Sequence, residues 1–470
     1  MKYGFSNKQL KEIVSFFREY SEVEEAVLFG SRAIDTYKEA SDVDIALKGN
    51  NVTASLSAKM KFNIEEDTYL PFFFDFVAYS TITSEELKQH IRNKGVVIYR
   101  RMGEWKEVKL NEVIISNNRS IGKDYIYEVI QYLDTGSITQ GKIVQLQEFK
   151  LSDAPSRAKR LVKNNDIVYS TVRPIQRHYG FIVTPPPNLV VSTGFSVIET
   201  DQGKAEPLFI YYYLTSTEIV EILDVIADGS TSAYPSLKPS DIENLGISLP
   251  PLPEQKAIAA VLSSLDDKID LLHRQNKTLE ALAEAVWQKM FVEEADPGWK
   301  KGKLGNVTSV STGKGLKRIE YNENGLYPVI GANGEIGRTD KYLTNEKLIL
   351  TGRVGTLGEI SISNKEVWIS DNVLIMKPNE ERFFYAVYFL LKNIDFENLN
   401  VVSTQPLVTQ TDLKNIEIEF PSNDVLDYFT TWCESAFNKI EQNVRQISTL
   451  SHLRDTLLPK LMSGEVRVSI

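Results

Sequence analysis

Apolar and polar residues follow different patterns on the two sides of residue 102, which predicts a domain boundary there. Before it, the pattern predicts a helix near residues 9–20, strands AVLFG, VDIAL and FFFDFVAY, a helix near 84–93 and a strand VVIYR. After it come short β-like runs separated by Gly, Asn, Asp and Pro. We therefore expect a small α/β domain over residues 1–101 and a boundary near 101–104.

The rest of the chain contains an internal repeat. Its copies open with EWKEVKLNEV and GWKKGKLGNV, which place Trp105 and Trp299 at equivalent positions. Each copy approaches its end through a matching step, SLKPSDIENLGISLP or LVTQTDLKNIEIEFP, and finishes in a long helix. We therefore expect two mixed α/β domains, over 103–250 and 297–421, each followed by a helical segment, over 251–295 and 422–465.

The two long helices carry the heptad spacing of a coiled coil. Apolar residues step by three and four from Ile258 to Met290 and from Leu426 to Leu461. Asn276 and Asn443 interrupt these series, and a polar residue at such a position commonly fixes helix register. Ordinary amphipathic core helices would explain one such segment, but they explain two segments that close matched repeats poorly. The pattern favours a coiled coil.

Length and cysteine content narrow the class of protein. A chain of 470 residues is too long for one hydrophobic core and fits about three compact units. Its single cysteine, Cys433, excludes an intrachain disulfide, and no Cys and His spacing resembles a structural zinc site. The N-terminus lacks the apolar core of a secretion signal, and no run is long and apolar enough to cross a bilayer. We expect a soluble cytoplasmic protein with no membrane partner.

The charge of the chain is acidic overall, with one basic stretch. A net charge of −10 and a pI near 5.3 argue mildly against nucleic-acid binding, because phosphate contacts need Lys and Arg. Residues 150–177, however, contain seven basic residues against two acidic ones. The basic ones are Lys150, Arg157, Lys159, Arg160, Lys163, Arg173 and Arg177. This stretch either faces phosphates or is an ordinary solvated surface.

Two runs in the second part of the chain resemble a known family. From residue 234, YPSLKPSDIENLGISLPPLPEQKAIAAVLSSLDDKIDLLHRQNKTLEALAEAVWQKMF resembles the junction between a target-recognition domain and a helical spacer in specificity subunits of type I restriction-modification enzymes. The run LRDTLLPKLMSGEVRV resembles the end of their second spacer. The resemblance covers roughly 103–470. It implies double-stranded DNA as ligand, two modification (methyltransferase) subunits and restriction subunits as partners, and no cofactor for this region.

Helix length gives this architecture a physical purpose. A helix of about forty residues is about 60 Å long. Two such helices packed antiparallel would hold the two recognition domains apart, around an approximate twofold axis. Because the two domains differ in sequence, we expect a bipartite, asymmetric DNA site with an unread gap set by helix length.

Residues suited to DNA contact occur in both recognition domains. Those of the first domain follow a strand-like run, and those of the second lie in Gly-rich loops. They are Arg173, Gln176, Arg177 and His178 in the first, and Lys314, Lys317, Arg318, Asn333, Arg338 and Arg353 in the second. Each of them taken alone is better explained as a surface residue than as a base reader.

Missing motifs indicate a subunit that recognises DNA without cutting or methylating it. Gly313-Lys314 lacks the upstream Gly and the following hydroxyl of a phosphate-binding loop. No Asn/Asp-Pro-Pro-Tyr/Phe run like that of amino-methyltransferases occurs. Methylation and cleavage are therefore expected from partner subunits.

The first domain carries a different motif. Gly30-Ser31 is followed by ten residues and then Asp42-Val43-Asp44, which resembles the minimal nucleotidyltransferase pattern of the polymerase β-like superfamily. Gly30, Ser31 and Arg32 are the expected nucleotide-binding residues, because a helix start with nearby positive charge suits a triphosphate. Asp42 and Asp44, two apart on a strand, project on one face and can bind Mg²⁺.

The same resemblance assigns a third carboxylate. Asp75, in FFFDFVAY, matches the acid that completes the metal site and helps to deprotonate the acceptor. Carboxylates spaced by two are common on exposed strands, but the Gly-Ser pair and Asp75 favour the nucleotidyltransferase interpretation. The expected cofactors are Mg²⁺ and a nucleoside triphosphate, and the acceptor is a protein side chain, an RNA end or a small molecule.

Three hypotheses follow. The leading one is an α/β multidomain specificity subunit, with recognition domains joined to antiparallel coiled-coil helices and an accessory nucleotidyltransferase domain. The second is a Mg²⁺-dependent nucleotidyltransferase acting on a protein or RNA partner, with the repeated domains used for targeting. In the third, the first domain is a passenger of a gene fusion.

Overall fold

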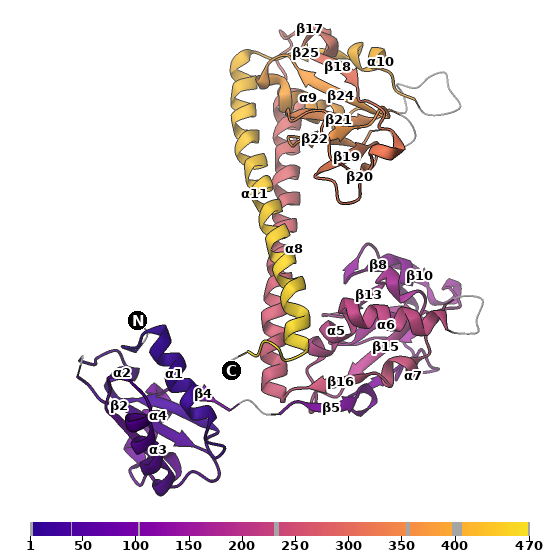
Figure 1. Ribbon diagram of the computed structural model, residues 1–470. Helices are drawn as coiled ribbons and strands as arrows, with labels where there is room; N and C mark the ends of the chain where they lie inside the picture. Colours follow the sequence, from indigo (N-terminus) through magenta and orange to yellow (C-terminus); the bar gives the residue numbers. More distant parts are fainter. Residues whose placement is uncertain are drawn as a thin grey trace. The chain divides into compact units, whose positions relative to one another are not determined.

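The computed structural model describes residues 3–38, 40–101, 104–229, 235–353, 358–396 and 407–468. Residues 102 and 103 of the expected boundary lie outside this part of the chain. Internal contacts group the chain into two units, Met1–Leu265 with Leu453–Ile470, and Asp266–His452. This division cuts through both long helices, so each unit contains part of each of them (Figure 1).

The N-terminal domain is one sheet with helices on both faces (Figure 1). Its strands, in the spatial order β3-β2-β1-β4, are β1 (Glu25–Phe29), β2 (Val43–Lys48), β3 (Phe74–Ala78) and β4 (Val96–Arg100). β2 is antiparallel to β1 and parallel to β3. Its helices are α1 (Asn7–Arg18), α2 (Gly30–Ala33), α3 (Ala54–Asp67) and α4 (Glu85–Lys94).

Alternation along the strands separates two cores in this domain. One side, which includes Phe74 and Phe76, packs against apolar residues of α1 and α3 such as Phe17 and Met60. The other side packs against Ile91 of α4. The predicted α/β domain is thus confirmed, and its third strand lies at the edge of the sheet.

The first recognition domain contains two four-stranded sheets, ordered β10-β7-β14-β11 and β13-β12-β15-β6. Its strands are β5 (Lys106–Lys109), β6 (Ile114–Ser116), β7 (Val129–Leu133), β8 (Ile138–Thr139), β9 (Lys142–Ile143), β10 (Gln147–Lys150), β11 (Ala158–Leu161), β12 (Ile167–Ser170), β13 (Tyr179–Phe181), β14 (Leu189–Ser192), β15 (Phe195–Thr200) and β16 (Gly246–Leu249). Its helices are α5 (Pro207–Thr215), α6 (Thr217–Asp228) and α7 (Pro239–Glu243).

The second recognition domain has a four-stranded sheet, β18-β24-β21-β22, and a three-stranded sheet, β20-β19-β23. Its strands are β17 (Lys300–Lys303), β18 (Thr308–Thr312), β19 (Tyr327–Gly331), β20 (Gly334–Thr339), β21 (Leu348–Gly352), β22 (Ile360–Ser363), β23 (Trp368–Ile369), β24 (Val373–Pro378) and β25 (Glu417–Phe420). Its helices are α9 (Phe384–Lys392) and α10 (Gln410–Lys414).

Backbone pairing shows that the sequence repeat is a structural repeat. The opening strand of each copy pairs antiparallel with the strand that precedes its long helix, β5 with β16 and β17 with β25. In each copy the next amide bonds back to the same segment, Leu110 N to Leu245 O (2.9 Å) and Leu304 N to Ile416 O (2.8 Å). Each domain therefore begins and ends at the same two-stranded sheet.

The long helices are α8 (Leu252–Gln288) and α11 (Asn423–Met462). In the unit Asp266–His452 they lie side by side in opposite directions, and Trp287 shares a core with Phe429 (Figure 1). The Asn443 Nδ2 donates to Asn276 Oδ1 (2.8 Å) and to Gln275 Oε1 (2.9 Å). The predicted antiparallel pairing is confirmed, and the two asparagines that interrupt the heptad series meet across the helix pair.

Helix α8 ends slightly earlier than the apolar pattern predicts. The α-helical hydrogen bonds stop at Gln288, and a π-turn follows over Lys289–Glu293. Among the described residues, no helix combines the length and hydrophobicity needed to cross a membrane.

Candidate active site and nucleic-acid interface

The three predicted carboxylates of the N-terminal domain lie on two neighbouring strands. Asp42 directly precedes β2, and Asp44 lies within it on the same face. Parallel pairing of β2 with β3 puts Asp75 in register with Asp44. Side chains in register on adjacent strands are neighbours, because the strands are about 4.8 Å apart. The structure therefore brings the three carboxylates to one face of the sheet.

Gly30 is required by the position of Asp44. The residue follows β1, begins α2 and has a φ of +71°. A Cβ atom added there would lie 2.3 Å from Asp44 Oδ2. The glycine therefore allows the start of α2 to approach the carboxylate closely.

The electrostatics of this face disfavour three bare carboxylates. Burial raises the pKa of Asp44, and the nearby charges of Asp75 and Asp42 raise it further. A divalent cation would relieve this repulsion, and carboxylate oxygens are the ligands that Mg²⁺ prefers. The donor chemistry therefore fits the expected metal.

The geometry is not that of an assembled metal site. Across the described residues, no three or more His, Cys, Asp or Glu side chains are grouped closely enough to hold a metal ion. The Asp75 Oδ1 instead lies 3.7 Å from Lys61 Nζ on α3. Lys61 is a residue that the sequence motif does not reveal, since only the packing of α3 beside β3 brings the lysine to Asp75.

The structure places Arg32 inside the N-terminal domain. The arginine is expected to bind nucleotide, but its side chain is only 1 % exposed. Its Nη2 donates to Ser41 O (2.7 Å) and its Nε donates to Asp42 O (3.2 Å). Its guanidinium also lies over the Phe72 ring, 4.9 Å from the centroid. Arg32 therefore holds the backbone that leads into Asp42.

All four DNA-contact candidates of the first recognition domain lie in one loop, between β12 and β13. Arg173 and Gln176 are exposed. The Arg177 Nη2 donates to Thr217 Oγ1 (3.2 Å). The His178 Nδ1 lies 2.7 Å from Ile138 O, so this ring is already engaged with the domain's own backbone.

The six candidates of the second domain lie on several separate segments. Lys314 follows β18, Lys317 and Arg318 open the turn before β19, Asn333 lies between β19 and β20, and Arg353 follows β21. The Arg338 Nε donates to Gly325 O (2.7 Å) and its Nη2 donates to Leu326 O (2.8 Å). This arginine fastens a turn of its own domain.

The basic stretch 150–177 is only partly free. Lys163 forms an ion pair with Glu199. Arg160 is half-buried, and burial lowers its pKa. The stretch is thus no continuous phosphate-facing surface, because some of its charges serve the domain itself.

The LPPLPEQ junction contains a buried polar cluster that the sequence analysis does not anticipate. Glu254 is fully buried, and both of its oxygens accept hydrogen bonds from Arg467 (2.8 and 2.6 Å). The Arg467 guanidinium lies 5.8 Å from the Trp105 ring centroid. Gln255, also buried, accepts from Glu206 N (2.8 Å) and donates to Pro250 O (2.8 Å). In the sequence, the sign of this cluster is the polar pair Glu254-Gln255 near the start of α8.

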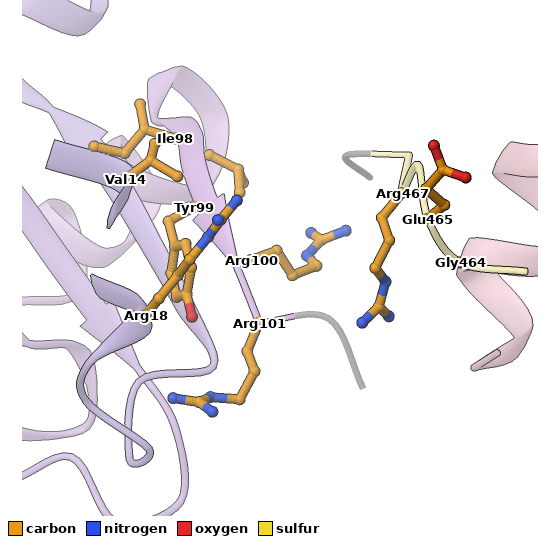
Figure 2. Close-up of a pocket in the computed structure, with 10 residues that line it drawn as sticks. Val14, Arg18, Ile98, Tyr99, Arg100, Arg101, Gly464, Glu465 and Arg467 are labelled. Atoms are coloured by element: carbon orange, nitrogen blue, oxygen red, sulfur yellow. The ribbon is translucent and has the colours of Figure 1, made fainter. Parts of the chain in front are cut away.

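A cavity of about 600 Å³ lies in the first unit, away from the three carboxylates, and is lined by four arginines (Figure 2). Arg100 is paired with Glu25, and Arg101 donates to Val23 O (3.2 Å) and Tyr20 O (2.5 Å). Arg467 is bound to Glu254. Because these three guanidinium groups have partners within the protein, the cavity is no ready anion site.

Comparison with known proteins identifies both parts of the chain. Residues 102–281 and 297–426 match the family described as "Type I restriction modification DNA specificity domain". Residues 11–104 match the family described as "Polymerase beta, Nucleotidyltransferase". The chain therefore belongs to the type I restriction-modification DNA specificity family, with a nucleotidyltransferase-like domain at its N-terminus.

The chain matches two curated relatives over most of the length of each relative. The chain is 24% identical over 465 residues to the type I restriction enzyme HindI specificity subunit of Haemophilus influenzae, covering 78% of this chain and 100% of the relative. It is 28% identical over 355 residues to the MjaIX specificity subunit of Methanocaldococcus jannaschii, covering 66% and 79%. The fold is also that of the type I S subunit from M. genitalium, with a TM-score of 0.52 and 20% identity over 76% of this chain and 96% of the other.

Proposed function

We propose that this protein is the DNA-recognition subunit of a type I restriction-modification complex and that it reads a bipartite, asymmetric site. The observation that carries the proposal is the structural repeat, in which two domains share the same closing sheet but differ in their loops. Equivalent domains suit equivalent positions along a duplex, and different loops suit different bases. The two half-sites therefore differ in sequence.

The gap between the half-sites depends on α8 and α11 in this proposal. Their 37 and 40 residues correspond to about 55 and 60 Å of helix. A rigid helix pair keeps the spacing constant without reading the intervening bases. The helices also offer long surfaces for modification subunits, of which we infer two.

The relatives support the choice of partners. The HindI and MjaIX proteins are specificity subunits of type I restriction enzymes. By analogy, this chain recruits modification and restriction subunits to double-stranded DNA. We infer that it acts in the cytoplasm.

Methylation mapping tests this function. The chain is co-expressed with the modification subunit of its own system in a host that lacks other adenine methylation, and methylated adenines are mapped across the genome. We expect methylation at a split motif with two unlike halves. A genome without new methylation contradicts the proposal.

We further propose that the N-terminal domain is a Mg²⁺-dependent nucleotidyltransferase. Asp42, Asp44 and Asp75 would hold the metal, which when bound supplies charge neutralisation for the triphosphate. Gly30 and Ser31 at the start of α2 would lie against the phosphates. Arg32 contributes indirectly, because it fixes the backbone before Asp42. The observation that favours this role is the register of Asp75 with Asp44.

Transfer of label from ATP tests this activity. The full chain is incubated with labelled ATP, Mg²⁺ and extracts of protein and RNA from its host. A labelled acceptor in the wild type that is missing with Asp42→Ala or Asp44→Ala supports the enzyme, and equal labelling in all three forms contradicts it. If an acceptor is labelled and the genome stays unmethylated, the repeated domains serve to target the nucleotidyltransferase. If the genome is methylated and no acceptor is labelled, the first domain is a passenger.

A further inference from the structure

The loop between β12 and β13 is held in a conformation that most side chains avoid. Arg173 has φ 47° and ψ 71°, and Arg177 has φ 56° and ψ 37°, so both lie in the left-handed region. They flank the short 3-10 turn Pro174–Gln176. An L side chain in this region crowds its own carbonyl, which is why Gly or Asn usually occurs there. Two arginines at such positions are a strained arrangement that the surrounding domain must impose.

The helix α6 supplies part of that constraint. The turn packs on α6, where Asp224 Oδ1 accepts a hydrogen bond from Ile175 N (3.0 Å). The Arg177 side chain donates to Thr217 Oγ1 at the start of the same helix (3.2 Å). The tip and the end of the loop are therefore fastened to a regular element rather than left to solvent.

Backbone hydrogen bonds hold both ends of the loop. Thr171 O accepts from Leu237 N (2.7 Å), and Arg173 N donates to Pro235 O (3.3 Å). At the far end, Arg177 O accepts from Gln140 N (2.8 Å). The loop is thus preorganised along its whole length.

What this constraint presents to solvent is a set of free side chains. Arg173 and Gln176 are exposed, and within the described residues neither side chain has a hydrogen bond or ion pair. Ile175 between them is 50 % exposed. By contrast, Arg177 and His178 are bound to their own domain.

The duplication identifies the equivalent loop in the second domain. Thr171 N donates to Gly194 O, and Thr171 O accepts from Leu237 N; Arg353 N donates to Asn372 O, and Arg353 O accepts from Val408 N. The hairpins β12–β13 and β21–β22 therefore leave their sheets at the same place in each fold. Arg353, which makes the backbone hydrogen bonds equivalent to those of Thr171, is half-buried.

We propose that the loop 173–177 is the base-reading element of the first recognition domain, in which Arg173 and Gln176 contact the DNA while Arg177 and Asp224 position them. This inference rests on the proposed DNA-recognition function. Arg suits the O6 and N7 atoms of guanine, and Gln suits the N6 and N7 atoms of adenine. The strain persists because it fixes the backbone from which these two side chains extend before DNA arrives, which reduces the ordering cost of the loop on binding.

Methylation mapping with loop variants tests the assignment. The full chain carrying Arg173→Ala or Gln176→Ala is co-expressed with the modification subunit, and methylated motifs are compared with those of the wild type. We expect at least one base of one half-site to become degenerate while the other half-site is unchanged. A motif that keeps all its bases in both variants overturns the assignment, and a uniform loss of methylation at an unchanged motif shows a phosphate contact instead.

A strain-matched control separates the loop from the rest of the domain. Thr184 is exposed, follows β13 and also has a positive φ, of 46°. Thr184→Gly and Arg173→Gly both relieve a left-handed residue, so neither lowers the melting temperature of the purified chain. We expect Thr184→Gly to retain wild-type affinity for a duplex carrying the mapped motif, whereas Arg173→Gly binds it about tenfold or more weakly. Equal affinity of the two variants contradicts the proposal.

The positioning role of Asp224 has its own readout. Asp224→Ala removes the acceptor of the Ile175 amide, whereas Asp224→Asn keeps an oxygen that can accept it. We expect the alanine variant to lose discrimination at the same base as Arg173→Ala and the asparagine variant to restore it. If neither variant changes the motif, the anchoring is structural only. If the wild type itself gives no methylation, the recognition function has failed, which is a different result from a loop that does not matter.

Discussion

At the scale of single residues, local geometry places the carboxylates of the N-terminal domain and the glycine beside them. The spacing of Asp42 and Asp44 places them on one strand face, and the glycine after β1 is required by a contact with Asp44. The guanidinium groups of Arg32 and Arg338 are each bound by carbonyl groups that only the fold brings near, which the sequence did not reveal. An arginine beside a motif can bind either a ligand or a carbonyl group of its own backbone. The sequence alone does not show which of these two partners it has.

Gly30→Ala is expected to weaken metal binding. The added Cβ falls 2.3 Å from Asp44 Oδ2, so either the carboxylate or α2 must move, at a positive φ that alanine disfavours. We expect Mn²⁺ affinity, measured by electron paramagnetic resonance on the full chain, to fall at least about tenfold. Gly122→Ala, where the added atom meets nothing within 4 Å, is the control. Unchanged affinity in Gly30→Ala would show that Asp44 is not a ligand.

The buried pair Glu254–Arg467 is expected to contribute strongly to stability. Arg467→Ala leaves a fully buried carboxylate without its cation, at a cost of about 3 kcal/mol in the free energy of unfolding. Lys460→Ala removes the exposed pair with Glu465 and costs about 0.5 kcal/mol or less. Urea denaturation of the purified chain compares the two. Equal effects would mean that Glu254 is solvated in solution.

Lys347 gives the second recognition domain a pH dependence. Burial lowers the pKa of Lys347, which lies over the rings of Phe384 and Tyr385. The folded state thus disfavours the charged amine, and stability rises as pH increases from the lowered pKa toward the ordinary value of 10.5. We expect thermal unfolding of Lys347→Met, followed at alkaline pH up to the ordinary lysine pKa of 10.5, to lack this gain. Lys341→Met, at an exposed ion pair, should keep it.

At the scale of elements, periodicity predicted the long helices closely and the recognition strands only in outline. The heptad series extends over tens of residues, so a local error in it changes little. The strands are mostly short, and their partners are set by the sheet: β14 lies between β7 and β11, an order that no run of residues reveals. The helix pair also shows one polar exception, because Asn443 is fully buried and its Oδ1 has no partner among the described residues.

Asn443→Leu is expected to raise the stability of the helix pair and to weaken its preference for one register. The leucine removes an unsatisfied buried oxygen and adds apolar contact, so the free energy of unfolding rises by about 1 kcal/mol. The hydrogen bonds to Asn276 and Gln275 that favour one register are lost. We expect a single mapped gap length for the wild type and more than one for the variant. A less stable protein with one gap would mean that the asparagine serves packing alone.

At the scale of the whole molecule, the family and the order of domains were predictable because long, specific runs carried them. The division of the chain into two units was not predictable, because the ion pair between Glu254 and Arg467 joins residues that lie 213 positions apart in the sequence. This contact between distant parts of the chain depends on three residues, Glu254, Arg467 and Trp105. The conformation of the loop Arg173–Arg177, which we propose to read bases, likewise follows from contacts distant in sequence.

The two functions are expected to be separable. Asp42→Ala with Asp44→Ala changes a face of the N-terminal sheet and no residue of the repeat. We expect the methylated motif of this double variant to match that of the wild type within sequencing error, while any labelling by ATP is lost. A changed motif would show that the N-terminal domain takes part in DNA reading.

The two-stranded sheet that closes each recognition domain bears on how such proteins diversify. Since β5 pairs with β16 and β17 pairs with β25, the polypeptide comes into each domain and goes out of it side by side. A gene segment bounded by these strands encodes one whole recognition domain. Exchanging it would change one half-site of the proposed DNA target and leave the two long helices intact. We therefore expect that exchange of such a segment between related genes would replace one recognition domain in a single event, with the fold of the rest of the chain kept.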